Sequence, residues 1–307
     1  MSKQSDERNK ASSIAVLTAL AANVAVAVSK IIAYLFTRSS SMLAEAVHSL
    51  ADSVNEVLLI VGGRQAVQEP TRMHPFGYAR NRYVFAFVVA IFLFFGSGAF
   101  ALWRGIEKLR DPEPIFYPGW AIAVLVVAMI FEGFALRTAV KRSAATQGNP
   151  SVGTFIKHAK TPELVVVLLE DLSALVGLSF AMAGVIATVV TGNARWDGFA
   201  TIAIGALMVC ISIVLAAKTR SLLIGEAAHP PVHQAIERSL TDGDTIEQIL
   251  DLRTQHLGPE LLLVAARIAV DEAADASDIA RAIAAAKRRI KKAVPYECVI
   301  YLEPALS

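Results

Sequence analysis

The chain has 307 residues, of which 55% are hydrophobic and only 18% are charged, so it is less charged than a typical soluble domain. Its net charge of +2 is too small to indicate a nucleic-acid partner. Its two cysteines, Cys210 and Cys298, lie far apart, which excludes a disulfide framework and a CxxC metal pair.

Six apolar stretches are long enough to cross a bilayer, which takes roughly 20 residues per helix. They are Ser13–Phe36, Ser41–Gly63, Tyr83–Ile106, Gly119–Val140, Pro162–Val190 and Asp197–Ala217. The polar tail before them, residues 1–12, is not followed by a small-residue cleavage signature, so we interpret the first stretch as a span rather than a signal peptide. We therefore predict an α-helical membrane protein with six transmembrane helices over residues 13–220.

Lys and Arg concentrate in alternate connections between these stretches. The loop after the second stretch holds Arg64, Arg72, Arg80 and Arg82, whereas the loop before it holds Arg38 alone. By the positive-inside rule, this bias places both termini in the cytosol. No organelle-targeting signal is evident, so we expect a multi-pass protein of a bacterial cytoplasmic membrane.

The last part of the chain, residues 221–307, has the pattern of a small soluble α/β domain. A helix is expected over residues 229–242, strands over 246–256 and 261–271, a helix over 275–294 and a last strand over 296–304. Asp275 or Ser277 is placed to cap the second helix. A domain this small would gain stability from dimerisation.

Ionisable residues within the apolar stretches are the candidates for function, because a charge at mid-bilayer costs at least ~2.5–3.5 kcal/mol and usually has a partner. His48 and Asp52 are four residues apart and share one helix face, which makes half of a tetrahedral site for a divalent metal ion. Glu170 and Asp171 lie at a similar depth in the fifth stretch. We predict that these four residues form a mid-membrane metal site, although a hydrogen-bonded pair that joins two helices is the alternative.

Other polar residues in the stretches carry weaker expectations. We expect Glu45 to be an interfacial or helix-locking carboxylate, and Lys30 to extend to the outer interface. Asn55 could orient a ligand. Glu56 and Glu132 remain open between pairing with a basic residue and a role in the ion pathway. The histidines outside the stretches are expected to be solvated: His74, His158, His229 and His233. Gly96 and Gly98 are expected to allow close helix packing.

The sequence resembles the cation diffusion facilitators, a family of metal–proton antiporters. SSSMLAEAVHSLADSVNEVLL resembles the second helix of the family, HPFGYAR the loop after it, EDLSALVGL the fifth helix, and LLIGEAA the junction with the cytosolic domain. The resemblance assigns metal-binding roles to His48, Asp52 and Asp171. Many members carry a histidine four residues before that aspartate, where this chain has Val167, and Glu170 could substitute for it.

The resemblance also implies a ferredoxin-like, metallochaperone-like cytosolic domain that forms a homodimer. Tyr301 stands where several members have a metal-binding histidine, so we expect no binuclear zinc site there. In the HPFGYAR loop, His74 matches a peripheral site of some relatives, but Tyr78 stands where those relatives have a second histidine.

These observations predict a secondary transporter that exports a divalent cation in exchange for protons, with the lipid bilayer as its surroundings and no cofactor. Zinc is expected first. Replacing a nitrogen ligand by an oxygen ligand leaves manganese, iron, cobalt or cadmium possible. An intramembrane metalloenzyme is disfavoured because no HExxH motif is present. A metal sensor without transport is the alternative that remains.

Overall fold

The computed structural model describes residues 23–147, 152–241, 245–271 and 273–306. The chain divides into two units. The helical unit comprises the described residues up to Val61 together with Phe85–Ile156 and Glu163–Ala217, and the C-terminal unit comprises Gly62–Val84, Lys157–Pro162 and the described residues from Lys218. The predicted tail, residues 1–12, lies outside the described residues, and the predicted domain boundary after residue 220 stays a prediction.

Helices occupy all six predicted stretches, as far as these are described. They are Asn23–Thr37, α2 (Ser40–Ala66), a continuous helix Asn81–Arg110, α5 (Pro118–Gln147), α7 (Pro162–Thr191) and α8 (Arg195–Ile224), with a short helix α6 (Val152–His158) before α7. Within the ranges that the structure describes, four segments are long and apolar enough to cross a membrane: Asn81–Arg110, Pro118–Lys141, Pro162–Thr191 and Arg195–Ile224. The chain is therefore a helical membrane protein, while six spans remain an inference.

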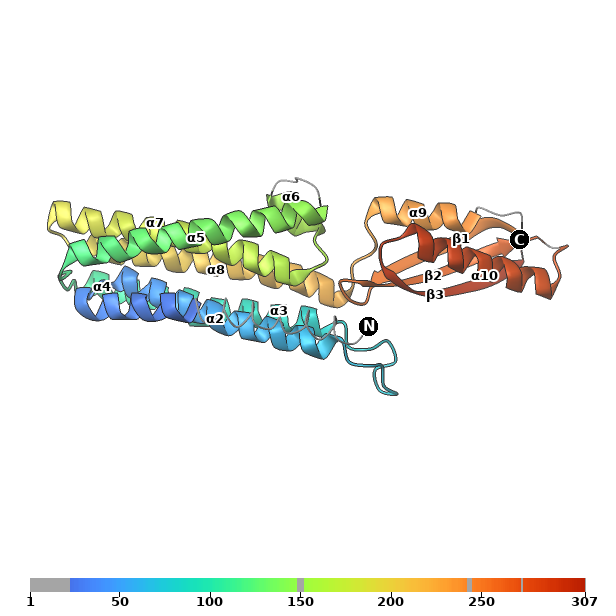
Figure 1. Ribbon diagram of the computed structural model, residues 1–307, viewed down its shortest axis with the longest axis horizontal. Helices are drawn as coiled ribbons and strands as arrows, with labels where there is room; N and C mark the ends of the chain where they lie inside the picture. The colour runs from blue at the N-terminus through green and yellow to red at the C-terminus, as the bar shows by residue number, and fades with distance from the viewer. Residues whose placement is uncertain (1–22, 148–151, 242–244, 272, 307) are drawn as a thin grey trace, which may run out of the picture. The chain divides into compact units, whose positions relative to one another are not determined.

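The core of the helical unit joins the helix Asn23–Thr37, α2, α4 (Phe100–Arg110), α5, α7 and α8. Leu125 of α5, Leu178 of α7 and Met208 of α8 are among the buried side chains of one apolar cluster. Figure 1 shows α5, α7 and α8 running side by side over most of their lengths. Apolar contact between these helices positions the polar residues described below.

The continuous helix Asn81–Arg110 packs against α8 at nearly backbone-to-backbone distance. A Cβ atom at Gly98 would lie 2.9 Å from Val209 Cγ2, and one at Gly205 would lie 2.6 Å from the Leu102 nitrogen. Only glycine fits such contacts, which is a common way for membrane helices to approach closely. The expectation of close packing is confirmed for Gly98, whereas the atoms nearest to a Cβ at Gly96 belong to Phe92 of its own helix.

This continuous helix changes its hydrogen-bonding pattern in the middle. It runs as α3 (Asn81–Phe92), a π-helical segment η1 (Leu93–Ala99) and α4 (Phe100–Arg110). Ser97 in η1 is buried, and its hydroxyl has no hydrogen-bond partner among the described residues. Wide π-turns inside α-helices are uncommon and often occur at functional sites.

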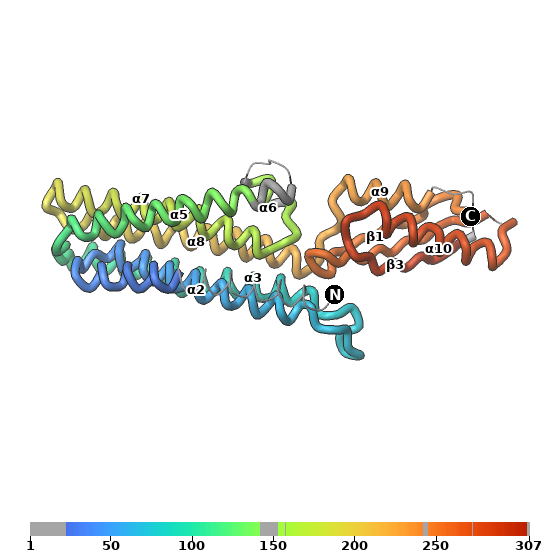
Figure 2. The backbone as a smooth tube through the Cα atoms, in the orientation of Figure 1, coloured from blue at the N-terminus to red at the C-terminus, as the bar shows by residue number. Residues whose placement is uncertain are grey.

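The C-terminal unit contains the predicted αββαβ pattern. Its elements are α9 (Pro230–Thr241), β1 (Ile246–His256), β2 (Leu261–Val270), α10 (Ala276–Ala293) and β3 (Glu297–Leu306). The strands form one sheet in the order β1-β2-β3, in which β1 and β2 are antiparallel and β2 and β3 are parallel. The backbone trace in Figure 2 follows this sheet and the two helices beside it.

Alternation along β2 explains this arrangement, because successive side chains of a strand point to opposite faces. Leu262, Val264 and Ile268 are buried in one core with Ile236 of α9 and Ile290 of α10, so both helices cover the same face of the sheet. Asp275 caps α10, since its side chain accepts a hydrogen bond from the Asp278 backbone nitrogen.

Candidate ion-binding site

The helix that carries the candidate ligands begins at a buried carboxylate. Three serines donate their hydroxyls to Asp197 in the first turn of α8, at 2.5 to 2.9 Å: Ser39, which directly precedes α2, and Ser40 and Ser41, which begin it. The backbone nitrogens of Ser40 and Ser41 also donate to it, at 2.6 and 3.3 Å. The first N–H groups of a helix lack intrahelical partners, so Asp197 completes the start of α2.

His48 and Asp52 lie together, as their i, i+4 spacing predicts. His48 Nδ1 is 3.4 Å from Asp52 Oδ1, and their side chains are 0% and 19% exposed. Among the described residues, neither ring nitrogen of His48 has a hydrogen-bond partner, nor does Asp52 Oδ1. Buried polar atoms are normally satisfied, so this pair has unused capacity to bind an ion.

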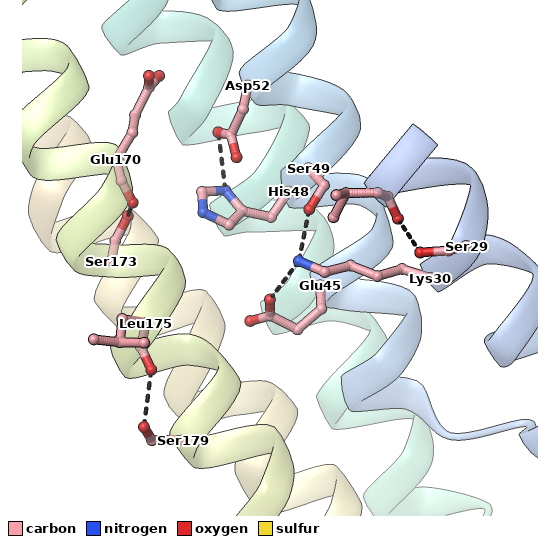
Figure 3. A network of polar contacts seen from close by, with 11 residues as sticks. Ser29, Lys30, Glu45, His48, Ser49, Asp52, Glu170, Ser173, Leu175 and Ser179 are labelled. Carbon is pink, nitrogen blue, oxygen red and sulfur yellow. Dashed lines mark hydrogen bonds and ion pairs between the residues drawn. The ribbon is translucent and has the colours of Figure 1, made fainter. Parts of the chain in front are cut away.

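The second predicted pair, Glu170 and Asp171 on α7, is arranged differently. Glu170 is buried, and Asn55 of α2 donates its side-chain amide to Glu170 Oε1 at 2.7 Å. Asp171 is partly buried. Figure 3 shows the Glu170 carboxylate directed away from His48. Asn55 therefore holds one candidate ligand and joins α2 to α7.

The four predicted residues do not form a closed metal site. Within the described ranges, no three His, Cys, Asp or Glu side chains lie close enough together to hold one metal ion. Asp52, Asp171 and Glu132 of α5 are nevertheless near enough for their charges to interact. Val167, which takes the place of the family histidine, is 39% exposed. The carboxylates thus lie around His48, but together with it they do not form a complete set of metal ligands among the described residues.

Lys30 corrects one sequence expectation. It does not extend to an interface, because its side chain is 0% exposed and its Nζ lies 3.3 Å from Glu45 Oε2. Lys30 Nζ also donates to Ser49 Oγ at 2.7 Å. Figure 3 shows this contact beside His48. Glu45 thus joins two helices. Glu56 accepts a hydrogen bond from the Asn23 amide at 3.2 Å.

The remaining histidines lie in the C-terminal unit. The His74 ring packs against Tyr78, and the His158 ring packs edge-on against His229 at 5.0 Å between centroids. His233 Nδ1 lies 3.5 Å from Glu237 Oε1. Burial lowers the pKa of His229, and the charges of His158 and Lys160 lower it further.

A charged group stands at the junction after α8. Glu226 accepts contacts from Lys160 at 2.5 Å and from Lys218 at 2.9 Å. Burial by itself would raise the pKa of Glu226, but hydrogen bonds from the two lysines lower it on balance. His256 on β1 is fully buried against the Tyr296 ring, and burial beside Lys160 lowers the pKa of His256 to about 4. Sequence reasoning missed His256.

Fold and site together define a helical membrane protein that buries ionisable side chains between its helices. A family model described as the cation efflux transmembrane domain matches residues 16–224. The chain belongs to the cation diffusion facilitator family, which confirms the resemblance seen in the sequence.

Three relatives illustrate the likeness. The human proton-coupled zinc antiporter SLC30A9, mitochondrial, is 30% identical over 232 residues, which cover 75% of this chain and 41% of that protein. Metal tolerance protein C4 of Arabidopsis thaliana is 31% identical over 251 residues, 80% of this chain and 54% of that protein. Cation-efflux pump FieF of Serratia proteamaculans is 25% identical over 230 residues, 75% of this chain and 72% of the pump. The chain thus spans about half or less of the first two relatives.

Proposed function

We propose that the protein exchanges a divalent metal ion for protons across a membrane, at a site built on His48 and Asp52. The buried and unsatisfied His48–Asp52 pair is the observation that carries this proposal. Ionisable side chains inside a membrane protein commonly mark an ion pathway. The names of the human and plant relatives, a zinc antiporter and a metal tolerance protein, agree with it.

The remaining ligands come from α7. Asp171 supplies one carboxylate. Glu170 supplies another when its hydrogen bond to Asn55 breaks, and it thereby replaces the histidine that many members of the family have at the position of Val167. One imidazole with carboxylates is compatible with zinc, while additional oxygen ligands favour manganese, iron or cobalt. Zinc is the first candidate because the human relative is named as a zinc antiporter.

Proton coupling follows from the ligand chemistry. A metal ion binds neutral imidazole and ionised carboxylate, so metal and protons compete for the same atoms. Protons that enter from the outer side release the metal there, and loss of protons to the cytosol reloads the site. The site opens alternately to the two sides, as central sites of secondary transporters do. The metal ion crosses chemically unchanged and protons are only bound and released, so the proposed activity is that of a transporter rather than an enzyme.

The topology belongs to the same proposal. Six helices cross the membrane, since Asn23–Thr37 and α2 occupy the first two predicted stretches and α2 is 27 residues long. Both termini lie in the cytosol, metal is exported, and a bacterial cytoplasmic membrane is the expected location. The C-terminal domain is of the ferredoxin-like, metallochaperone-like type and forms a homodimer.

Metal flux into proteoliposomes with an imposed pH gradient tests the proposal. Zinc, manganese, iron(II), cobalt and cadmium are compared for the parent protein and for His48→Ala, Asp171→Asn and Glu170→Gln. We expect saturable flux that depends on the gradient, and a loss of about 10–100-fold or more with His48→Ala, since even residues that only support a metal ligand cost that much when removed. His233→Ala, in the C-terminal unit, is the matched control and keeps parental flux.

The three variants separate the parts of the proposal. Loss of flux with Glu170→Gln supports its role as the substitute ligand, while parental flux assigns the metal to His48, Asp52 and Asp171 alone. Absence of flux for all five metals, from parent protein that binds metal and is folded, would contradict transport and favour a sensor.

A further inference from the structure

The proposed function does not use the buried ion pair of Lys30 and Glu45. Lys30 Nζ contacts Glu45 Oε2 at 3.3 Å and donates to Ser49 Oγ at 2.7 Å. Both members of the ion pair are fully buried. Removing two charges from water costs several kcal/mol per ion, and a buried pair often gives little net stability in return. A purely structural role therefore explains this pair poorly.

Glu45 lies on the same face of α2 as the proposed metal ligands. Glu45, His48 and Asp52 are separated by three and then four residues, and such residues are neighbours along one side of a helix. Figure 3 shows the Glu45 carboxylate beside His48, one helical turn from it. The face that supplies the two ligands His48 and Asp52 thus contains a third ionisable side chain, the carboxylate of Glu45.

One oxygen of this carboxylate is unused. Lys30 engages Glu45 Oε2, whereas Glu45 Oε1 is buried and has no hydrogen-bond partner in the part of the chain that the structure describes. A Cβ atom at Gly177 of α7 would lie 2.5 Å from Glu45 Oε1, so this oxygen is directed at the helix that carries Asp171. The side chain is placed between the two helices of the site.

We propose that Lys30 is a tethered cation that withholds Glu45 from the transported metal ion. This inference rests on the proposed function. The ammonium neutralises a carboxylate that would otherwise be an additional ligand beside His48 and Asp52. A transport site must bind strongly enough to load and weakly enough to release its ion. By holding Glu45, Lys30 lowers the affinity of the site and speeds release.

Zinc binding to the purified full-length protein tests this role, by competition with a chromophoric chelator. Lys30→Met frees Glu45, and we expect it to bind zinc at least about tenfold more tightly, with slower release in the flux assay. The double variant Lys30→Met/Glu45→Gln removes both the cation and the freed ligand, so we expect parental affinity. A pair that only joins two helices would give no gain in affinity for the single variant.

Two outcomes overturn the inference. One is folded Lys30→Met protein whose zinc affinity is unchanged or weaker. The other is a double variant whose affinity falls more than about tenfold, which would mean that Glu45 already binds metal in the parent. The double variant has no unpaired buried charge, so it remains informative if Lys30→Met fails to fold.

The same titrations distinguish this inference from the proposed function. Zinc binding that His48→Ala removes, together with unaltered affinity of Lys30→Met, overturns only the role of Lys30. Parent protein that binds no metal, or binds it equally after His48→Ala, overturns both. Thermal unfolding of each variant accompanies the titrations, so that loss of binding is separated from loss of fold.

Discussion

The helical unit and the C-terminal unit bury different kinds of side chain. The helical unit encloses Lys30, Glu45, His48 and Asp197, all at 0% exposure. The core cluster of the C-terminal unit consists of apolar side chains such as Ile236, Leu262 and Ile290. The helical unit therefore adds buried polar contacts between helices to its apolar core, whereas the core of the C-terminal unit rests on apolar packing between a sheet and two helices.

The difference teaches where function is located. Burying charge is costly unless it is paired, so a fold retains buried charges where a partner or an ion uses them. In the helical unit Asp197 accepts several hydrogen bonds, while neither ring nitrogen of His48 makes a hydrogen bond to another described residue, and its nearest charged partner is Asp52 at 3.4 Å. Asp197 therefore stabilises the helical unit, whereas His48 remains available to bind an ion.

The largest expected effect is that of Asp197→Ala. It leaves the three serine hydroxyls and two backbone N–H groups at the start of α2 without their acceptor. We expect the helical unit to lose about 3–5 kcal/mol of its free energy of unfolding, as when a buried charged network is broken. Tryptophan fluorescence during denaturation measures this, because Trp103, Trp120 and Trp196 all lie in the helical unit. A loss below about 1 kcal/mol would contradict the role of Asp197.

Ile290→Ala tests the apolar side of the comparison. Ile290 is fully buried in the core between α10 and the sheet, and truncating such a side chain costs about 2–5 kcal/mol because a cavity remains. We expect faster hydrogen exchange of the β1 and β2 amides, measured by mass spectrometry. The exposed Lys292 provides the control, since Lys292→Ala leaves exchange unchanged. Equal protection of these amides from exchange in Ile290→Ala and Lys292→Ala would show that the apolar core around Ile290 does not stabilise the sheet.

His256 adds a pH dependence to the C-terminal unit. Its pKa is lowered to about 4 in the folded chain, from an ordinary value of 6.5. Between these two values the unfolded chain binds more protons, so stability falls as the pH decreases from 6.5 to 4, by at most about 3 kcal/mol. Hydrogen exchange of β1 at several pH values, corrected for intrinsic exchange, measures it. His256→Gln removes the dependence and His233→Gln keeps it; an identical slope in both variants would exclude His256 as its source.

Asp275→Ala gives the smallest expected effect and pairs with Asp197→Ala. Both aspartates complete the first turn of a helix, but Asp275 is exposed to solvent. Loss of an exposed N-cap costs typically ~1 kcal/mol, because water replaces the lost acceptor. Exchange of the α10 amides measures it, and Arg288→Ala, an exposed change far from the cap in the same helix, is the control. If Asp275→Ala reduced stability as much as Asp197→Ala, burial of the aspartate would not determine how much such a residue contributes.

The sequence predicts the C-terminal unit closely because its signals are local. The strand expected over residues 246–256 is β1 with the same limits, and Asp275 caps α10 as one of the two expected residues. Alternation, turn residues and caps act between neighbours in the chain, so they can be recognised without the fold. The helices of the membrane part are likewise found where apolar runs predict them.

The contacts of the helical unit were less predictable. His48 and Asp52 meet because both lie on one helix, whereas the partners of Lys30 and Glu170 lie on other helices. Lys30 was therefore wrongly expected at an interface. The bond between Asp197 and the serines joins residues about 157 positions apart, and the only signal was an acidic residue in the first turn of α8. Sequence spacing does not reveal which helices become neighbours.

The π-helical segment η1 has a consequence for work on the long helix Asn81–Arg110. A π-turn accommodates one residue more than an α-turn, and each residue advances an α-helix by about 100°. The face that α4 presents is consequently out of phase with the face that α3 presents. Labels or cross-links placed by extending the helical wheel of α3 beyond Ala99 would point in the wrong direction, so pairs of probes on this helix must be chosen separately before and after η1.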